Sequence, residues 1–143
     1  MSVSPAISLS QSLTIHRSRS GRIALWGLQV ALAALFLSAG GSKLAGAPAM
    51  VALFDAIGIG QWFRVVTGLI EVLSAVALLV PALAPFAALL LVSTMIGAIT
   101  THLFVVGGSA ALPGLLLLGA LVVVWARRGQ LPGAVSRRQQ ANA

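Results

Sequence analysis

The stretch that decides the fold is residues 23–42, IALWGLQVALAALFLSAGGS, which contains no charged side chain. As an α-helix these twenty residues would be about 30 Å long, which matches the hydrocarbon thickness of a bilayer. A cleaved signal peptide is the competing interpretation, because residues 45–47 (AGA) resemble a cleavage site. The apolar run is too long for that interpretation, and Pro48 would follow the cut. The stretch therefore predicts a transmembrane helix.

Three further apolar segments have the same character, and the predicted spans are 23–44, 62–80, 85–106 and 111–126. Pro81 and Pro85 end one helix and open the next, so that the second and third spans should form an antiparallel hairpin. A turn is expected at residues 107–109 (GGS), before the fourth span.

A shorter apolar segment lies between the first two spans. Met50, Leu53, Phe54 and Ile57 recur at helical spacing after Pro48, but the segment is too short to cross a bilayer. It is expected to lie at the membrane surface. The predicted fold is therefore an all-α integral membrane four-helix bundle, with a short interfacial helix between the first and second spans.

The composition supports a membrane protein and excludes several other classes. Of 143 residues, 59% are apolar and 8% are charged, against roughly half and a quarter in soluble domains. The net charge of +7 comes without a basic face or motif that would read nucleic acid, so the lipid bilayer is the expected partner. Because cysteine is absent, disulfides, thiolate metal sites and thiol relays are excluded.

The basic residues are distributed unevenly between the two sides of the predicted bundle. Seven lie toward the termini, at positions 17, 19, 22, 127, 128, 137 and 138, and two, Lys43 and Arg64, lie on the opposite side. The positive-inside rule then predicts a multi-pass membrane protein with both termini in the cytoplasm. Residues 1–22 and 127–143 are expected to be disordered tails. The Ser/Arg-rich start also fits an organelle transit peptide, although basic anchoring is favoured.

Few polar side chains inside the predicted spans could carry chemistry. Glu71 is the single acidic residue within a span, and such residues usually mark a functional site because ionisable groups are costly in a bilayer. Lys43, His102 and Thr101 are predicted to lie in the same half of the membrane. We expect these four residues to form an outward-facing polar pocket for a small polar or quinone-type head group. The alternative is that Lys43 and Glu71 only neutralise one another and fix the helix register.

Small residues beside this site favour close helix packing, chiefly Gly40, Gly41 and Gly68. Such surfaces are also compatible with a homo-oligomer. No metal site and no covalently bound cofactor is expected, because the spans offer no second histidine and the chain has no glycine-rich nucleotide loop.

Together these motifs resemble the DoxX family, and more closely its DoxX-like branch. The resemblance covers residues 22–128 and is carried by 40–44 (GGSKL), 68–71 (GLIE), 78–81 (LLVP) and 98–102 (AITTH), in this order on successive spans. It implies a small four-helix inner-membrane protein, in a family named for a subunit linked to thiosulfate and quinone oxidation. By position, Lys43, Glu71 and His102 match polar positions of the family, whereas Ser74 stands where small residues, often glycine, are usual.

Three functions remain open at this point. The favoured hypothesis is an accessory subunit of a membrane oxidoreductase, with quinone as candidate ligand and a redox protein as partner. A small-molecule transporter would resemble four-helix exporters that use one membrane glutamate, but theirs lies on the first helix and Glu71 lies on the second. A scaffold or assembly protein without catalysis would account for the small-residue surfaces and the lack of a complete catalytic constellation.

Overall fold

The computed structural model of the protein describes residues 19–130, which are helical with short connections. The five α-helices are α1 Arg19–Leu44, α2 Pro48–Ile57, α3 Gln61–Leu78, α4 Ala84–Thr101 and α5 Ala111–Arg127. A π-helical turn, His102–Val106, continues α4, and a 3-10 turn, Arg128–Gln130, follows α5. Four of the helical segments are long and apolar enough to cross a membrane. The all-α prediction, with a short helix between the first and second spans, is confirmed.

The first helix starts earlier than the apolar run that predicted it. It begins at Arg19, whereas the span was expected from Ile23, because Arg19 and Arg22 are good helix formers that extend the helix beyond the apolar segment. At 26 residues α1 is about 39 Å long, longer than the hydrocarbon core alone requires. Of the tails predicted for residues 1–22 and 127–143, residues 19–22 and 127–130 are helical. The rest of both tails lies outside the described residues.

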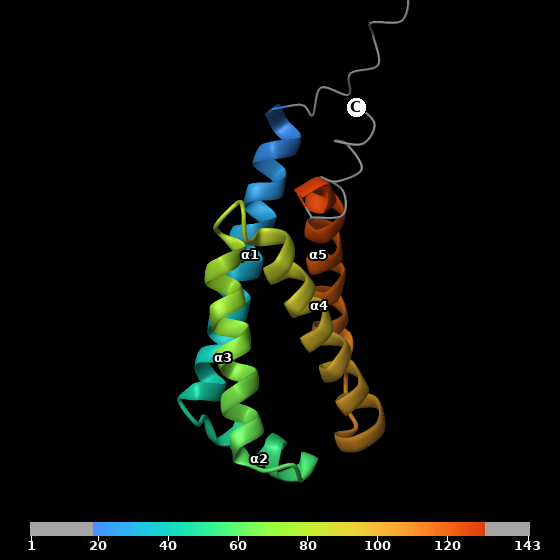
Figure 1. The fold of residues 1–143 in the computed structure, drawn as a ribbon. Coiled ribbons are helices and arrows are strands. Elements are labelled where there is room, and N and C mark those ends of the chain that lie inside the picture. The colour runs from blue at the N-terminus through green and yellow to red at the C-terminus, as the bar shows by residue number, and fades with distance from the viewer. Residues whose placement is uncertain (1–18, 131–143) are drawn as a thin grey trace, which may run out of the picture.

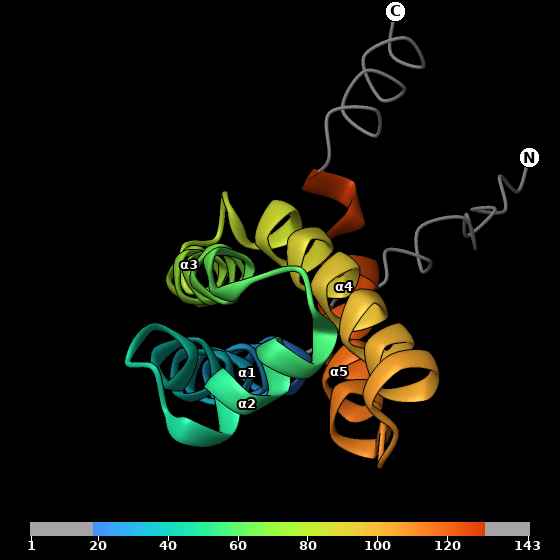
Figure 2. The ribbon, with the colours of Figure 1, turned by 90° about the horizontal axis from the view of Figure 1, so that it is seen from below.

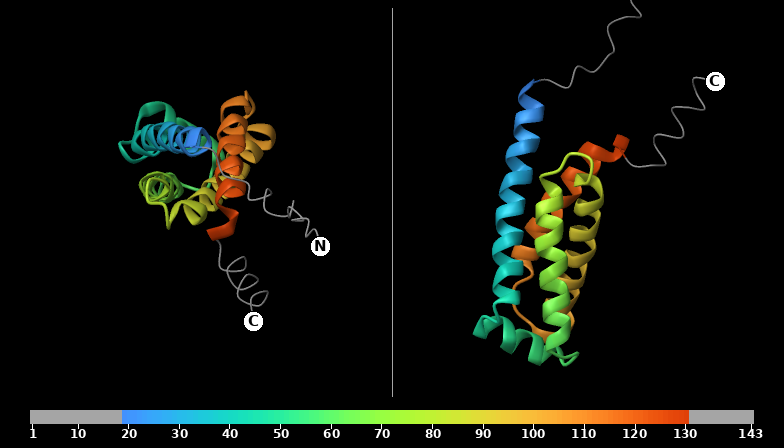
Figure 3. Two further views of the ribbon diagram at one scale, coloured as in Figure 1. Left: turned by 90° about the horizontal axis from the view of Figure 1, so that it is seen from above. Right: turned by 60° about the vertical axis from the view of Figure 1, so that its left-hand side comes forward.

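The helices form two pairs that run up and down along one axis. Helix α1 packs most extensively against α3, and α4 packs against α5, while α3 and α4 form the predicted hairpin. Figure 1 shows α1 starting and α5 finishing at the same end, called here the terminal end. From that end, Figure 3 shows the α1–α3 pair beside the α4–α5 pair.

The centre of the bundle is filled by a few large side chains set between small ones. Phe36, Leu78 and Leu91 are fully buried, and alanines such as Ala75 and Ala88 lie among them. Most other large apolar side chains point outward on all four spans. An exterior as apolar as the interior is expected when lipid replaces water around the bundle, and packing then depends on shape and on polar contacts.

Helix α2 crosses the opposite end of the bundle, called here the α2 end (Figure 2). Pro48 stands in its first turn, and Gly58 ends it in a left-handed conformation, φ 78°, which glycine adopts without a Cβ clash. Phe54 is buried and meets Phe63 of α3 edge to face, with ring centroids 5.8 Å apart. The Gln61 amide donates to the Val51 carbonyl at 3.0 Å, which ties α2 to the start of α3.

The fold predicts that both chain ends emerge on the same face of the membrane, because four spans carry the chain across an even number of times. A topology reporter fused in turn to each terminus should be active on the same side. Reporters active on opposite sides would contradict the four-span assignment.

Candidate functional site

Helices α1 and α3 approach each other most closely where two glycines face one another. A Cβ added to Gly40 would lie 2.8 Å from Val72 Cγ2 and 2.9 Å from the Gly68 carbonyl oxygen. A Cβ added to Gly68 would lie 3.1 Å from the Gly40 carbonyl oxygen. A side chain at Gly40 would therefore push the two helices apart, and one at Gly68 would fit only if its neighbours shifted slightly. Gly41, expected on the same packing surface, does not share it, because a Cβ there would meet nothing within 4 Å.

The close approach places a lysine and a glutamate in direct contact. Lys43 follows Gly40 by three residues and Glu71 follows Gly68 by three, so each charged side chain lies on the same helix face as its glycine. Lys43 Nζ donates to Glu71 Oε2 at 2.8 Å. The Glu71 side chain is 2% exposed and that of Lys43 is 15% exposed. The Glu71 side chain is therefore enclosed between the helices, whereas the Lys43 side chain is partly exposed.

The backbone of Lys43 is held by a second basic residue. Arg64 of α3 donates from Nη1 to the Lys43 carbonyl oxygen at the C-terminal end of α1, and from Nε to Gln61 Oε1 at 2.6 Å. The last carbonyl groups of a helix lack partners within the helix, and the helix dipole makes this end negative. Arg64 supplies a positive charge and a hydrogen-bond donor at this end of α1. From the sequence, Arg64 was expected only to lie on the side of the bundle opposite the termini.

His102 and Thr101 lie at the end of α4, at the same end of the bundle as Lys43. Within residues 19–130, no hydrogen bond or ion pair links either of them to Lys43 or Glu71. The structure thus joins two of the four predicted pocket residues directly and leaves the other two separate. His102 Nδ1 is buried without a hydrogen-bond partner, and the π-helical turn starts at this residue. Such turns are frequent at functional sites.

A second polar cluster, which the sequence did not predict, lies near the terminal end. Gln29 of α1 is fully buried, and its amide donates to the Leu78 carbonyl at 2.7 Å. Arg127 of α5 is 8% exposed and donates from Nη2 to Gln29 Oε1 at 2.8 Å. Arg127 Nη1 also reaches the Pro81 carbonyl at 3.4 Å. This cluster links α1, the end of α3 and α5.

Arg127 ends α5, and its side chain also belongs to this buried cluster, which its place among the basic residues near the termini did not indicate. The sequence signal was Gln29, an amide within an otherwise apolar span, because a buried amide needs a hydrogen-bond partner. The partner lies 98 positions away along the chain, and no local pattern points to it.

Fold and site together define a small multi-pass membrane protein whose first and second spans are joined by an intramembrane ion pair. The chain belongs to the DoxX-like family, whose sequence model matches residues 27–126. The match includes Lys43, Glu71 and His102. No curated protein and no solved structure is significantly similar to the chain.

The Gln29–Arg127 cluster makes a testable contribution to stability. Arg127→Gln should lower the free energy of unfolding by about 2 kcal/mol, because the buried Gln29 oxygen loses a charged donor. The matched control is Arg128→Gln, whose exposed guanidinium lies 5.2 Å from the Trp125 ring centre and should cost less than about 1 kcal/mol. Thermal unfolding in detergent measures both, and equal losses would contradict the assignment.

Proposed function

We propose that this DoxX-like protein is an accessory subunit of a quinone-linked membrane oxidoreductase. The observation that carries the proposal is the Lys43–Glu71 pair, an amine and a carboxylate 2.8 Å apart within the candidate spans, with the Lys43 side chain partly exposed. Ionisable residues at such depth usually mark the path of a substrate, an ion or a proton. The family match supports a membrane protein of this type and leaves its redox role to experiment.

The chemistry that these side chains can supply is hydrogen bonding and proton transfer. A quinone, when bound, supplies two-electron, two-proton redox chemistry, with the electrons coming from the partner oxidoreductase. Lys43 Nζ has three donor hydrogens, so it can donate to a ligand carbonyl oxygen while it keeps its bond to Glu71 Oε2. Glu71 can then exchange a proton through Lys43, and His102 Nδ1 is a further unpaired group at this end of the bundle.

One observation favours a second function, that of a scaffold without catalysis. Lys43 and Glu71 satisfy each other across the Gly40–Gly68 contact, which is the arrangement expected of a pair that fixes helix register. In that case the protein would stabilise a partner without taking part in its turnover.

The proposal also assigns an orientation and a membrane. The larger number of basic residues toward the termini supports an orientation with both chain ends in the cytoplasm, and the proposed membrane is the inner membrane. The α2 end, with Lys43 and His102, would then face the opposite compartment, where a redox partner could dock.

The proposal predicts that Glu71→Gln reduces quinone recovered with the purified protein at least fivefold, because the neutral amide no longer holds Lys43 in position. Mass spectrometry of protein extracted with its native lipids measures quinone and copurifying polypeptides per chain. Asp55→Asn is the charge-matched control, since Asp55 is exposed on α2 and should leave recovery unchanged.

Arg127→Gln controls for lost stability, because it weakens the bundle at the terminal end, away from this site. If wild type carries neither quinone nor an oxidoreductase, or if Arg127→Gln loses as much as Glu71→Gln, the redox proposal fails. The scaffold function would instead be established if loss of the protein lowered the abundance of a partner and left the partner's turnover per molecule unchanged.

A further inference from the structure

Helix α3 holds Lys43 at two points, about two helical turns apart. The Glu71 carboxylate accepts from the Lys43 amine, and Arg64, seven residues earlier on α3, donates from Nη1 to the Lys43 backbone carbonyl. Gly68 lies between them, four residues after Arg64 and three before Glu71, so all three share the face of α3 that meets α1. The backbone and the amine of Lys43 are therefore both fixed by α3.

The Arg64 contact does more than satisfy a carbonyl at a helix end. The Lys43 carbonyl oxygen also accepts from the Gly46 backbone N–H at 3.2 Å, so it has a partner without Arg64. The guanidinium lies against the turn that follows α1, because a Cβ added to Gly46 would be 3.7 Å from Arg64 Nη1 and 3.8 Å from Nη2. Arg64 therefore holds the last turn of α1 against α3, at the residue whose amine meets Glu71.

Arg64 is itself held by a side chain that also binds α2. Its Nε donates to Gln61 Oε1 at 2.6 Å, and the Gln61 amide donates to the Val51 carbonyl of α2 at 3.0 Å. The same amide donates at 2.7 Å to Oδ1 of the exposed Asp55, an acceptor that asparagine would also supply. A continuous chain of hydrogen bonds thus runs from the α2 backbone through Gln61 and Arg64 to the Lys43 carbonyl.

We infer that Arg64 is a positioning residue for the Lys43 amine, and that α2 sets the position of this amine through Gln61 and Arg64. A lysine side chain is long and flexible, so its amine stays in one place only when the backbone that carries it is held as well. A ligand at this amine is part of the proposed function, on which the inference rests, but the amine can be observed without that ligand. If Arg64 only capped α1, it would stabilise the helix and leave the amine where it is.

The test observes this amine directly, because Lys43 is the only lysine of the chain. The full-length protein is produced with isotope-labelled lysine, and the rate of hydrogen exchange at the Lys43 ammonium group is measured by NMR in detergent. Glu71→Gln gives the rate of the released amine, which should be at least about tenfold faster than in wild type because a charge-assisted hydrogen bond is lost. Arg64→Gln should raise the rate at least about fivefold, although it leaves Glu71 in place.

Three further variants separate position from charge and from α2. Arg64→Lys keeps the positive charge but lacks the planar fork that donates to two acceptors at once, so it should raise the rate as much as Arg64→Gln. Gln61→Met removes the hydrogen bonds to Arg64 and to α2, and it should raise the rate about threefold. Arg64→Gln added to Glu71→Gln should cause no further change, because Arg64 acts through the ion pair.

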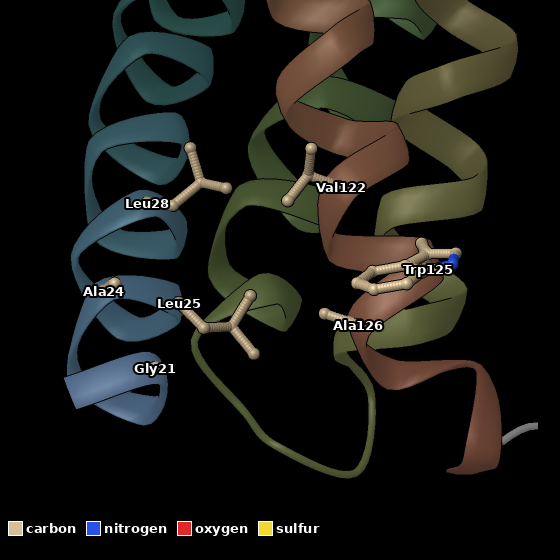
Figure 4. Close-up of a pocket in the computed structure, with 7 residues that line it drawn as sticks. All are labelled: Gly21, Ala24, Leu25, Leu28, Val122, Trp125 and Ala126. Atoms are coloured by element: carbon tan, nitrogen blue, oxygen red, sulfur yellow. The ribbon is translucent and has the colours of Figure 1, made fainter. Parts of the chain in front are cut away.

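Leu28→Ala is the control for a general loosening of α1. Leu28 faces Val122 of α5 across a hollow at the terminal end, where no residue of the hydrogen-bond chain lies (Figure 4). It is about 22 Å from Lys43 along α1. The variant enlarges this hollow and should change the exchange rate less than about twofold. Helical circular dichroism of each variant confirms that it is folded, and Arg64→Lys and Gln61→Met carry the test if Arg64→Gln does not fold.

The positioning role is overturned if Arg64→Gln exchanges as slowly as wild type, or if wild type exchanges as fast as Glu71→Gln. It is also overturned if Arg64→Lys keeps the wild-type rate, or if Leu28→Ala speeds exchange as much as Arg64→Gln. Gln61→Met at the wild-type rate would overturn the role of α2. Faster exchange in the Arg64 variants of a protein that carries no quinone would support the positioning role and overturn the redox proposal alone.

Discussion

The bundle is organised around one ion pair, between Lys43 of α1 and Glu71 within the candidate span α3. An isolated carboxylate at this depth would be costly, so it requires a partner on a neighbouring helix. The lysine can reach it because Gly40 and Gly68 let the α1 and α3 backbones touch one turn away. Arg64 then holds the carbonyl end of α1, and the chain turns into α2 from a fixed point.

A second polar link, at the terminal end, complements the first. Gln29 and Arg127 join α1 to α5 and to the end of α3, whereas Lys43 and Glu71 join α1 to α3 alone. Between these two links the bundle is packed by alanine and a few large apolar side chains, with lipid outside. Hydrophobic burial distinguishes poorly between helix pairings in a membrane, so hydrogen-bonded and charged contacts of this kind define which helices meet.

The sequence predicted the elements well and their polar contacts only in part. Spans and the short α2 were predictable because a bilayer imposes length and hydropathy on each segment separately. The approach of Lys43 to Glu71 could be predicted from the sequence, because the position of each residue along its helix puts both in the same half of the membrane. The Gln29–Arg127 contact and the π-helical turn at His102 were not, because they depend on how distant segments pack and on local backbone geometry.

Lys43 and Glu71 act as one unit that joins α1 to α3. A double-mutant cycle with Lys43→Met and Glu71→Gln, followed by reversible unfolding in detergent, tests it most directly. We expect each single change to cost about 2–4 kcal/mol and the double change to cost at least about 1 kcal/mol less than their sum. If the losses in the free energy of unfolding of the two single variants add up to the loss of the double variant, the two residues are independent and do not act as one unit.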